Sequence, residues 1–72
     1  MHTHHTKLVR ENDLVAEVTV ERIESDDPWA PYLSVEDARK LDSVRLALRH
    51  GDVVAARRYG PVYRLTPVPA GV

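Results

Sequence analysis

The sequence predicts an α+β fold in which two helices cover one face of a small antiparallel sheet of two or three strands. Alternating apolar and polar residues over 14–21 indicate a strand. Residues 34–59 carry two pairs of helix start and stop signals. A short apolar run over 62–66 indicates a closing strand. The expected order is strand, helix, helix and strand, with room for an extra short strand in front, in one small domain spanning residues 1–72.

The strand signal is strongest over 14–21. Apolar residues at every second position define one face, and the polar residues Glu17, Thr19 and Glu21 lie on the other. The alternation slips near Arg22, so we expect either a bulge or the strand end at that position.

Weaker signals flank this strand. Residues 7–10 are expected to form the short leading strand, and the closing strand is expected to bury Tyr63 and Leu65. Residues 1–6 show no apolar periodicity, and two prolines interrupt residues 67–72, so both segments are expected to be flexible tails.

The first helix is expected over 35–49. Ser34 can cap it with its side-chain oxygen, Asp37 completes a weak capping box, and the His-Gly pair at 50–51 ends it. A break near Asp42, a second candidate cap, would split the helix and rotate its faces. The stripe expected to face the core comprises Ala38, Leu41, Val44 and Leu48.

The second helix is expected over 53–59, because Asp52 can cap it and the Gly-Pro pair at 60–61 stops it. Leu46 falls outside the stripe of the first helix, as either a surface residue or part of a dimer seam. The residues of the second helix expected to face inward are Val53, Ala56 and Tyr59.

A loop is expected over 25–32 from its two prolines and acid pair. Trp29, the sole Trp of the chain, stands there on stiff backbone between prolines. It either plugs the end of the core or presents an aromatic knob to a partner. His2, His4 and His5 have donor atoms for zinc or nickel, but nothing near them supplies a rigid shell, so we predict no metal site.

Size and composition point to a chain that needs a partner. A 72-residue chain buries only about 60% of its unfolded surface, and without Cys it has no disulfide or thiolate metal site to staple it. We therefore expect a homodimer. No apolar run approaches the roughly 20 residues needed to cross a bilayer, and no secretion signal opens the sequence, so we expect a cytoplasmic protein.

Charge is segregated along the chain. Residues 11–37 hold nine acids against Arg22 alone, whereas residues 38–72 hold seven bases against two acids. The acidic strand face and the adjoining loop are expected to receive a protein partner, because such a surface complements a basic one. The expected partner-binding residues are Glu17, Glu21, Glu24, Asp26, Asp27, Trp29 and Tyr32.

The basic residues of the helical part offer a second surface, one that phosphates would fit. The competing interpretation is that these charges pair along their own helices and favour the helix dipoles. The candidate nucleic-acid-binding residues are Arg39, Lys40, Arg45, Arg49, Arg57 and Arg58.

Signals of catalysis are weak. Ser34 and Ser43 lack the context of an activated nucleophile, and His50 is the one base near them in the helical segment. The glycines form no phosphate-binding loop, and the acids at 24–27 lack the alternating ligands of a calcium loop. No enzyme activity and no cofactor are predicted.

Three segments carry a resemblance: Trp29 to Asp42, Leu48 to Asp52 and Val62 to Val68. In these the chain resembles a group of short, largely uncharacterised bacterial proteins that includes antitoxin-like members of two-gene modules. The resemblance implies a small binding protein that neutralises or accompanies a partner while contacting its own promoter. The strand over 14–21 is long and acidic, whereas ribbon-helix-helix antitoxins read the major groove with a short polar or basic strand.

The sequence therefore predicts a non-enzymatic, antitoxin-like or regulatory protein that engages a protein partner. Two alternatives stay open: a nucleic-acid-binding module that uses the Arg-rich helices, and a small structural subunit of an enzyme complex.

Overall fold

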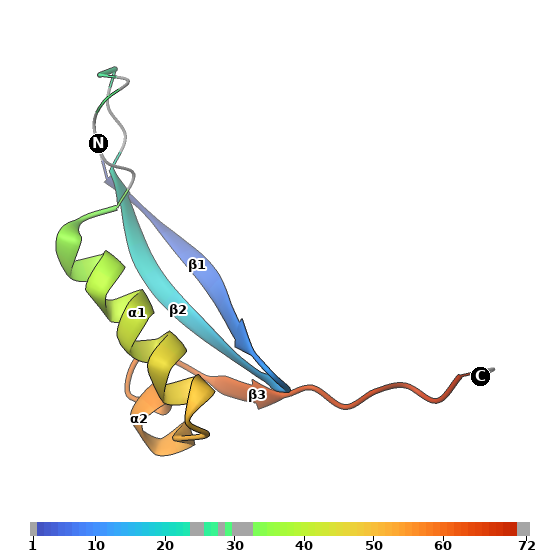
Figure 1. Ribbon diagram of the computed structural model, residues 1–72. Helices are drawn as coiled ribbons and strands as arrows, with labels where there is room; N and C mark the ends of the chain where they lie inside the picture. The colour runs from blue at the N-terminus through green and yellow to red at the C-terminus, as the bar shows by residue number, and fades with distance from the viewer. Residues whose placement is uncertain (1, 24–25, 28, 30–32, 71–72) are drawn as a thin grey trace.

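The computed structural model describes residues 2–23, 26–27, 29 and 33–70. Within these ranges the chain forms strands β1 (His2–Glu11), β2 (Leu14–Ile23) and β3 (Val62–Arg64), and helices α1 (Val35–Arg49) and α2 (Val53–Arg57). The strands form an antiparallel sheet in the order β1-β2-β3, and α1 and α2 lie on one of its faces (Figure 1). The predicted α+β class and element order are confirmed.

β1 is much longer than the sequence suggests. It pairs with β2 without interruption from His2 opposite Ile23 to Glu11 opposite Leu14. The prediction of a tail over residues 1–6 is therefore wrong for residues 2–6. Among the described residues of β1, Val9 alone is buried in the core, so backbone pairing to β2 holds the rest and leaves no apolar pattern to detect.

A two-residue turn at Asn12 and Asp13 joins β1 to β2. Asn12 has a φ of 56°, a left-handed conformation that Asn tolerates better than most residues. The position of this turn sets the register, and so decides that Val9 lies opposite Ala16 on the same face of the sheet.

β2 follows its predicted alternation. Its residues 14, 16, 18 and 20 are at most 5% exposed and pack beneath the helices. The register continues unbroken through Arg22, so no bulge forms there and the strand ends at Ile23.

α1 is one unbroken helix that carries the helical half of the core. Val44 and Leu48 are buried, Leu41 packs against them, and Leu46 is half exposed, as its off-stripe position predicts. Ala38 was expected in the stripe but is exposed. Its neighbour, the less exposed Asp37, turns to the sheet instead, where its carboxylate accepts a hydrogen bond from β2.

α2 is shorter than predicted. Asp52 caps it by accepting from the N–H of Ala55, and Ala56 enters the core. The helix ends at Arg57, and Tyr59, expected to face inward, is 40% exposed.

β3 is also shorter than predicted, and its faces are reversed. Val62 lies opposite Ala16, so Val62 packs against the core, while Tyr63 points to the other face and is 49% exposed. The expectation that Tyr63 and Leu65 are buried is wrong, because cross-strand register and not local hydropathy assigns the faces.

Two glycines have distinct roles at the helix ends. Gly51, after α1, has a φ of +71°, which glycine adopts without a steric penalty. At Gly60, before β3, a Cβ atom would overlap the carbonyl group of Glu17. Gly60 therefore lets the chain pass close to β2, and the N–H of Glu17 donates to the carbonyl of Pro61 at 2.9 Å.

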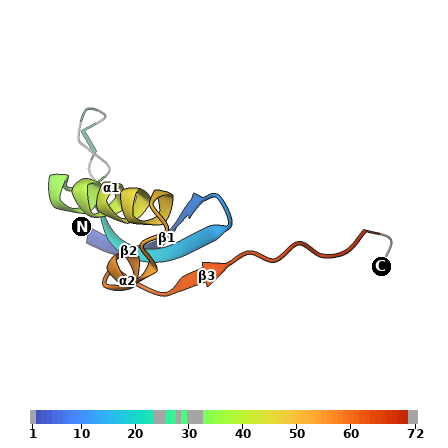
Figure 2. The same cartoon turned by 60° about the horizontal axis from the view of Figure 1, so that its bottom comes forward.

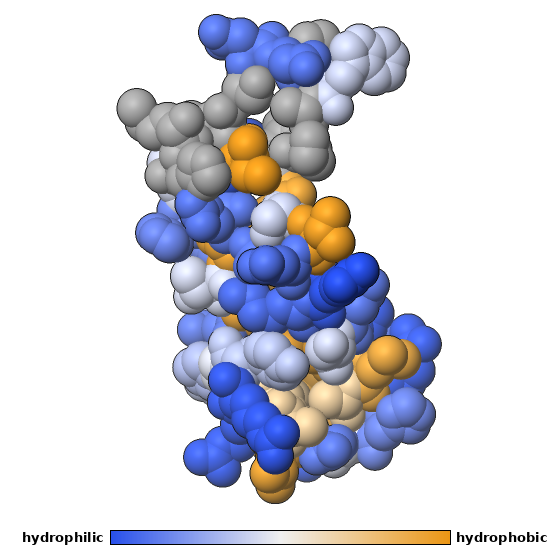
Figure 3. Space-filling view, turned by 90° about the vertical axis from the view of Figure 1, so that its left-hand side faces the viewer, coloured by the Kyte–Doolittle hydropathy of each residue, from blue (hydrophilic) through white to orange (hydrophobic). Residues whose placement is uncertain are grey.

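Beyond β3 the chain leaves the body of the molecule as an extended arm (Figure 2). Residues 65–70 belong to no helix or strand and are exposed. The predicted tail thus lies outside the sheet as far as the described residues reach. On the helical side, the surface is mostly hydrophilic with scattered apolar side chains (Figure 3).

Candidate interaction surfaces

No helix among the described residues covers the face of the sheet opposite α1 and α2 (Figure 1). We call it the open face. It carries the side chains that alternate with the core residues of each strand, and Leu8 and Tyr63 are 68% and 49% exposed on it. Its described members on the paired strands are His4, Thr6, Leu8, Arg10, Val15, Glu17, Thr19, Glu21, Ile23 and Tyr63.

Cross-strand register arranges the open face in rows. Arg10, Val15 and Tyr63 stand in one row, and Leu8 stands opposite Glu17 in the next. These two rows therefore mix apolar and charged side chains, and the Glu17 carboxylate lies next to aliphatic and aromatic surface.

Only part of the predicted partner-binding set gathers on the open face. Glu17 and Glu21 are there, both half-buried. Asp26, Asp27 and Trp29 are exposed and lie beyond the end of β2. The remaining two residues, Glu24 and Tyr32, lie outside the described residues.

Trp29 is 90% exposed, and its backbone N–H donates to the Asp27 carboxylate at 3.0 Å. The interpretation of Trp29 as a core plug is therefore wrong. Its side chain has the exposure expected of an aromatic knob.

β3 pairs only with the first residues of β2, and the first turns of α1 cover the rest of that edge of β2. The carbonyl of Thr19 accepts from Lys40 Nζ at 2.7 Å, and the N–H of Glu21 donates to Asp37 Oδ2 at 2.7 Å. Leu33 adds a bridge to Arg22. These contacts supply partners for backbone groups that a strand edge would otherwise present to solvent.

Asp37 accordingly departs from its predicted capping-box role. Its N–H donates to Ser34 Oγ at 3.1 Å, as predicted, but its carboxylate serves the sheet. The hydrogen bond from the Glu21 N–H lowers the pKa of Asp37. Partial burial of the carboxylate raises this pKa, and Lys40, with Nζ 3.4 Å from Oδ1, lowers it further, so the net pKa is lowered.

The outer edge of β1 is different, because no described strand or helix pairs with it. On β2, the odd-numbered residues direct their backbone groups toward β3, as the bond from Glu17 to Pro61 shows. The even-numbered residues of β2 therefore face the odd-numbered residues of β1. The backbone groups of the even-numbered β1 residues consequently point away from the sheet; these residues are His4, Thr6, Leu8 and Arg10.

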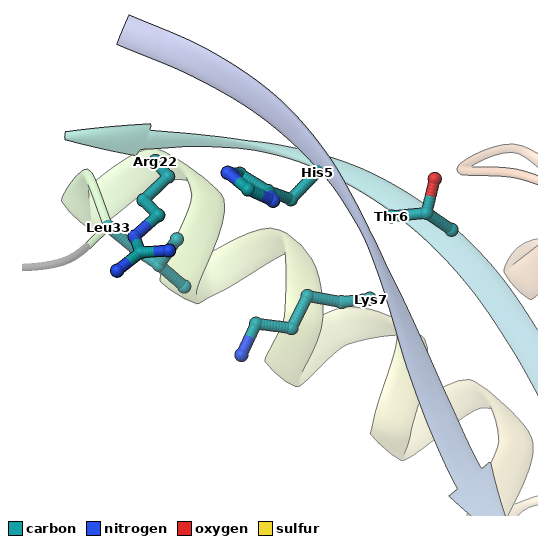
Figure 4. A pocket seen from close by; sticks show the side chains of 5 residues that line it. All are labelled: His5, Thr6, Lys7, Arg22 and Leu33. Carbon is teal, nitrogen blue, oxygen red and sulfur yellow. The ribbon is translucent and has the colours of Figure 1, made fainter. Parts of the chain in front are cut away.

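A hollow of about 410 Å³ lies between β1 and the start of α1 (Figure 4). His5, Lys7 and Arg22 bring cationic or protonatable groups to it, and its other described lining residues are Thr6 and Leu33. Sequence reasoning missed it because residues 1–6 were expected to form a flexible tail, which would leave His5 outside the sheet. The available signal was that His5 and Lys7 lie in phase with the apolar Val9.

His4 and His5 are consecutive on β1 and so point to opposite faces of the sheet. His5 Nε2 lies 3.0 Å from Thr3 Oγ1. Among the described residues, no three side chains of His, Asp or Glu gather closely enough to hold a metal ion.

Half of the predicted nucleic-acid-binding residues engage groups of the chain itself. Besides the Lys40 contacts, Arg45 pairs with Asp42 at 3.1 Å, and Arg49 pairs with Glu11 of β1 at 3.0 Å. Arg57 and Arg58 line a shallow hollow of about 250 Å³ on α2, while Arg39 is exposed on α1. The chain's own acids therefore compete with phosphates for this surface.

The residues weighed as catalytic occupy structural positions. Ser34 caps α1, His50 forms its C-cap, and Ser43 is exposed on it.

In the part of the chain that the structure describes, no helix has the length and apolar character required to span a membrane. Compared with known proteins, the chain matches no family model, no curated protein and no solved structure.

Proposed function

We propose that this chain is a small non-enzymatic binding protein, antitoxin-like or regulatory, that engages a protein partner through its open face and the Trp29 loop. The observation that carries the proposal is the open face itself, where the exposed Leu8 stands opposite Glu17 and the exposed Tyr63 stands in the neighbouring row.

The mixture of side chains on the open face supports contact with a protein partner and not permanent exposure to water. A sheet face that is exposed to solvent usually carries polar side chains. The centre of a protein interface, in contrast, is enriched in aromatic and apolar groups with polar groups around them. Tyr63 and Val15 supply such a centre, and Trp29 adds a second exposed aromatic group. Tyr and Trp are frequent anchors of binding energy.

The charges indicate the kind of partner. Glu17 and Glu21 lie on the open face, and Asp26 and Asp27 lie in the loop after β2. A partner with a basic surface complements this arrangement and associates faster as a result. The resemblance to antitoxin-like proteins supports a toxin as that partner.

The test is recovery of the partner with the full-length chain from its native source, followed by binding measurements with purified variants. Tyr63→Ala and Glu17→Lys should each weaken binding by about tenfold or more, since they alter the apolar centre and the charge of the open face. Trp29→Ala should weaken it while leaving the melting temperature unchanged.

Leu46→Ala is the matched control, because Leu46 is an exposed apolar residue on α1, away from the open face. If Leu46→Ala weakens binding while Tyr63→Ala does not, the open face is not the binding surface and the proposal fails.

A further inference from the structure

We infer that the outer edge of β1 is a second binding site, which takes an extended acidic segment of a protein partner as an added strand. The segment's carboxylates would enter the hollow lined by His5, Lys7 and Arg22. This site differs from the open face, and the inference does not depend on the function proposed above.

The edge has the length and the hydrogen-bonding groups for strand addition. β1 spans ten residues, and the N–H and C=O groups of its even-numbered residues point outward, as derived above. The described residues of β1 include no proline and no bulge, the features that commonly protect an edge. At the opposite edge of the sheet, Asp37 and Lys40 bond to backbone groups of β2. The backbone groups of that edge therefore have partners, whereas those at the outer edge of β1 have none among the described strands and helices.

The hollow lies where alternate side chains of an added strand would fall. On the helix side, β1 presents His5 and Lys7, both exposed. A strand paired to the outer edge would place every second side chain beside them on that same face. Arg22 and Leu33 form the far wall, so the site combines positive charge with some apolar surface.

Charge complementarity selects the occupant. Among the described lining residues of the hollow, none is acidic. β1 itself carries Lys7 and Arg10 against Glu11, so antiparallel pairing of two copies of β1 would bring like charges together. An acidic segment avoids this repulsion. In the partner's segment we expect two carboxylate residues separated by one other residue. The side chain of that middle residue would lie on the open face, near Thr6 and Leu8.

A synthetic ten-residue peptide that alternates glutamate with valine serves as the probe, and a lysine–valine peptide is its matched control. Amide hydrogen exchange followed by NMR reports the geometry. In the free protein, the amides of Thr6 and Leu8 should exchange fast and those of His5 and Lys7 slowly. The glutamate peptide should protect Thr6 and Leu8, and its affinity should fall with salt.

Two variants separate the backbone contribution from the charge contribution. Lys7→Glu should weaken binding of the glutamate peptide by about tenfold and improve that of the lysine peptide. Thr6→Pro removes an outward N–H that makes no bond to β2, so the fold should persist while binding is lost. Circular dichroism checks the fold, and if Thr6→Pro unfolds the chain, Lys7→Glu remains the deciding variant.

Several outcomes would overturn the inference. Equal binding of both peptides would remove charge selection. Protection of Thr6 and Leu8 that rises with protein concentration alone would make a second copy the occupant. Resonance shifts of His5 and Lys7 caused by inorganic phosphate, with no edge protection by the peptide, would reduce the site to simple anion binding. Variants Glu17→Lys and Tyr63→Ala should leave peptide binding unchanged, so failure here and failure of the open-face proposal are distinguishable.

Discussion

At the scale of single residues, a few side chains and one glycine decide how the segments meet. Asp37 lies in the first turn of α1, yet its carboxylate accepts from Glu21 of β2. Gly60 lets the chain pass against the Glu17 carbonyl. In both cases a local helix signal in the sequence coincides with a long-range contact.

Gly60→Ala should destabilise the protein by about 2–4 kcal/mol, because its Cβ would overlap the Glu17 carbonyl, a backbone group that cannot move aside easily. Gly51→Ala is the control: its Cβ would meet no atom within 4 Å, so it should lose only about 1 kcal/mol from its positive φ. Chemical denaturation measures both, and equal losses would contradict the close approach at Gly60.

Asp37→Ala should lower the free energy of unfolding by about 1–3 kcal/mol, since it leaves the Glu21 N–H without its acceptor. Asp37→Asn, which keeps an acceptor oxygen, should lose less. Thermal unfolding of the two variants at neutral pH makes the comparison.

The lowered pKa of Asp37 also predicts a pH dependence. The pKa is lower in the folded state than in the unfolded state, so the ionised group stabilises the fold above the unfolded pKa. That contribution is lost as pH falls through the folded pKa, which lies below the ordinary value of an aspartate. The stability difference between the wild type and Asp37→Asn should therefore shrink with acidification, and a difference that grows would contradict the assignment.

At the scale of elements, α1 is the principal cover of the sheet. Its N-terminal turns contact the β2 edge, and Arg49 in its last turn pairs with Glu11 at the end of β1. The helix thus crosses the sheet diagonally, and Val44 and Leu48 fill the space between.

Leu48→Ala should lower the free energy of unfolding by about 2–5 kcal/mol, because it opens a cavity in a core with few other large side chains. A domain of this size has a total stability of about 5 kcal/mol, so the variant should keep at most about 3 kcal/mol and unfold at a clearly lower temperature than the wild type. Leu46→Ala, on the exposed side of the same helix, should change stability by less than about 0.5 kcal/mol. Urea titrations of the pair test whether the predicted stripe is the packed one.

At the scale of the whole molecule, the chain is thin and extended. Its radius of gyration is 14.8 Å, against about 11 Å expected for a compact chain of this length, and its shortest dimension is 17 Å. The long hairpin and the C-terminal arm account for the extension (Figures 1 and 2). A layer of helices on one side of a sheet buries one face and leaves the other for a partner.

Occupation of the open face should therefore stabilise the protein. If a second copy covers that face, as the expected homodimer would, the melting temperature should rise with protein concentration. Tyr63→Ala should then remove the dependence. A melting temperature independent of concentration, together with a monomeric sedimentation coefficient, would leave the open face to a different partner.

The sequence by itself determined the fold class, the buried face of β2, the caps at Ser34 and Asp52 and the stripe of α1 except for Ala38, because periodicity and capping are local properties of the chain. Tertiary structure alone decided the length of β1, the reversed faces of β3, the exposure of Trp29 and the basic hollow. Those features depend on which strands pair with each other and in which register. Pairing with β2 orders residues 2–6 that bury little, and a register of Val62 opposite Ala16 turns Tyr63 outward. Hydrogen bonding across strands leaves no pattern in the single sequence of either strand.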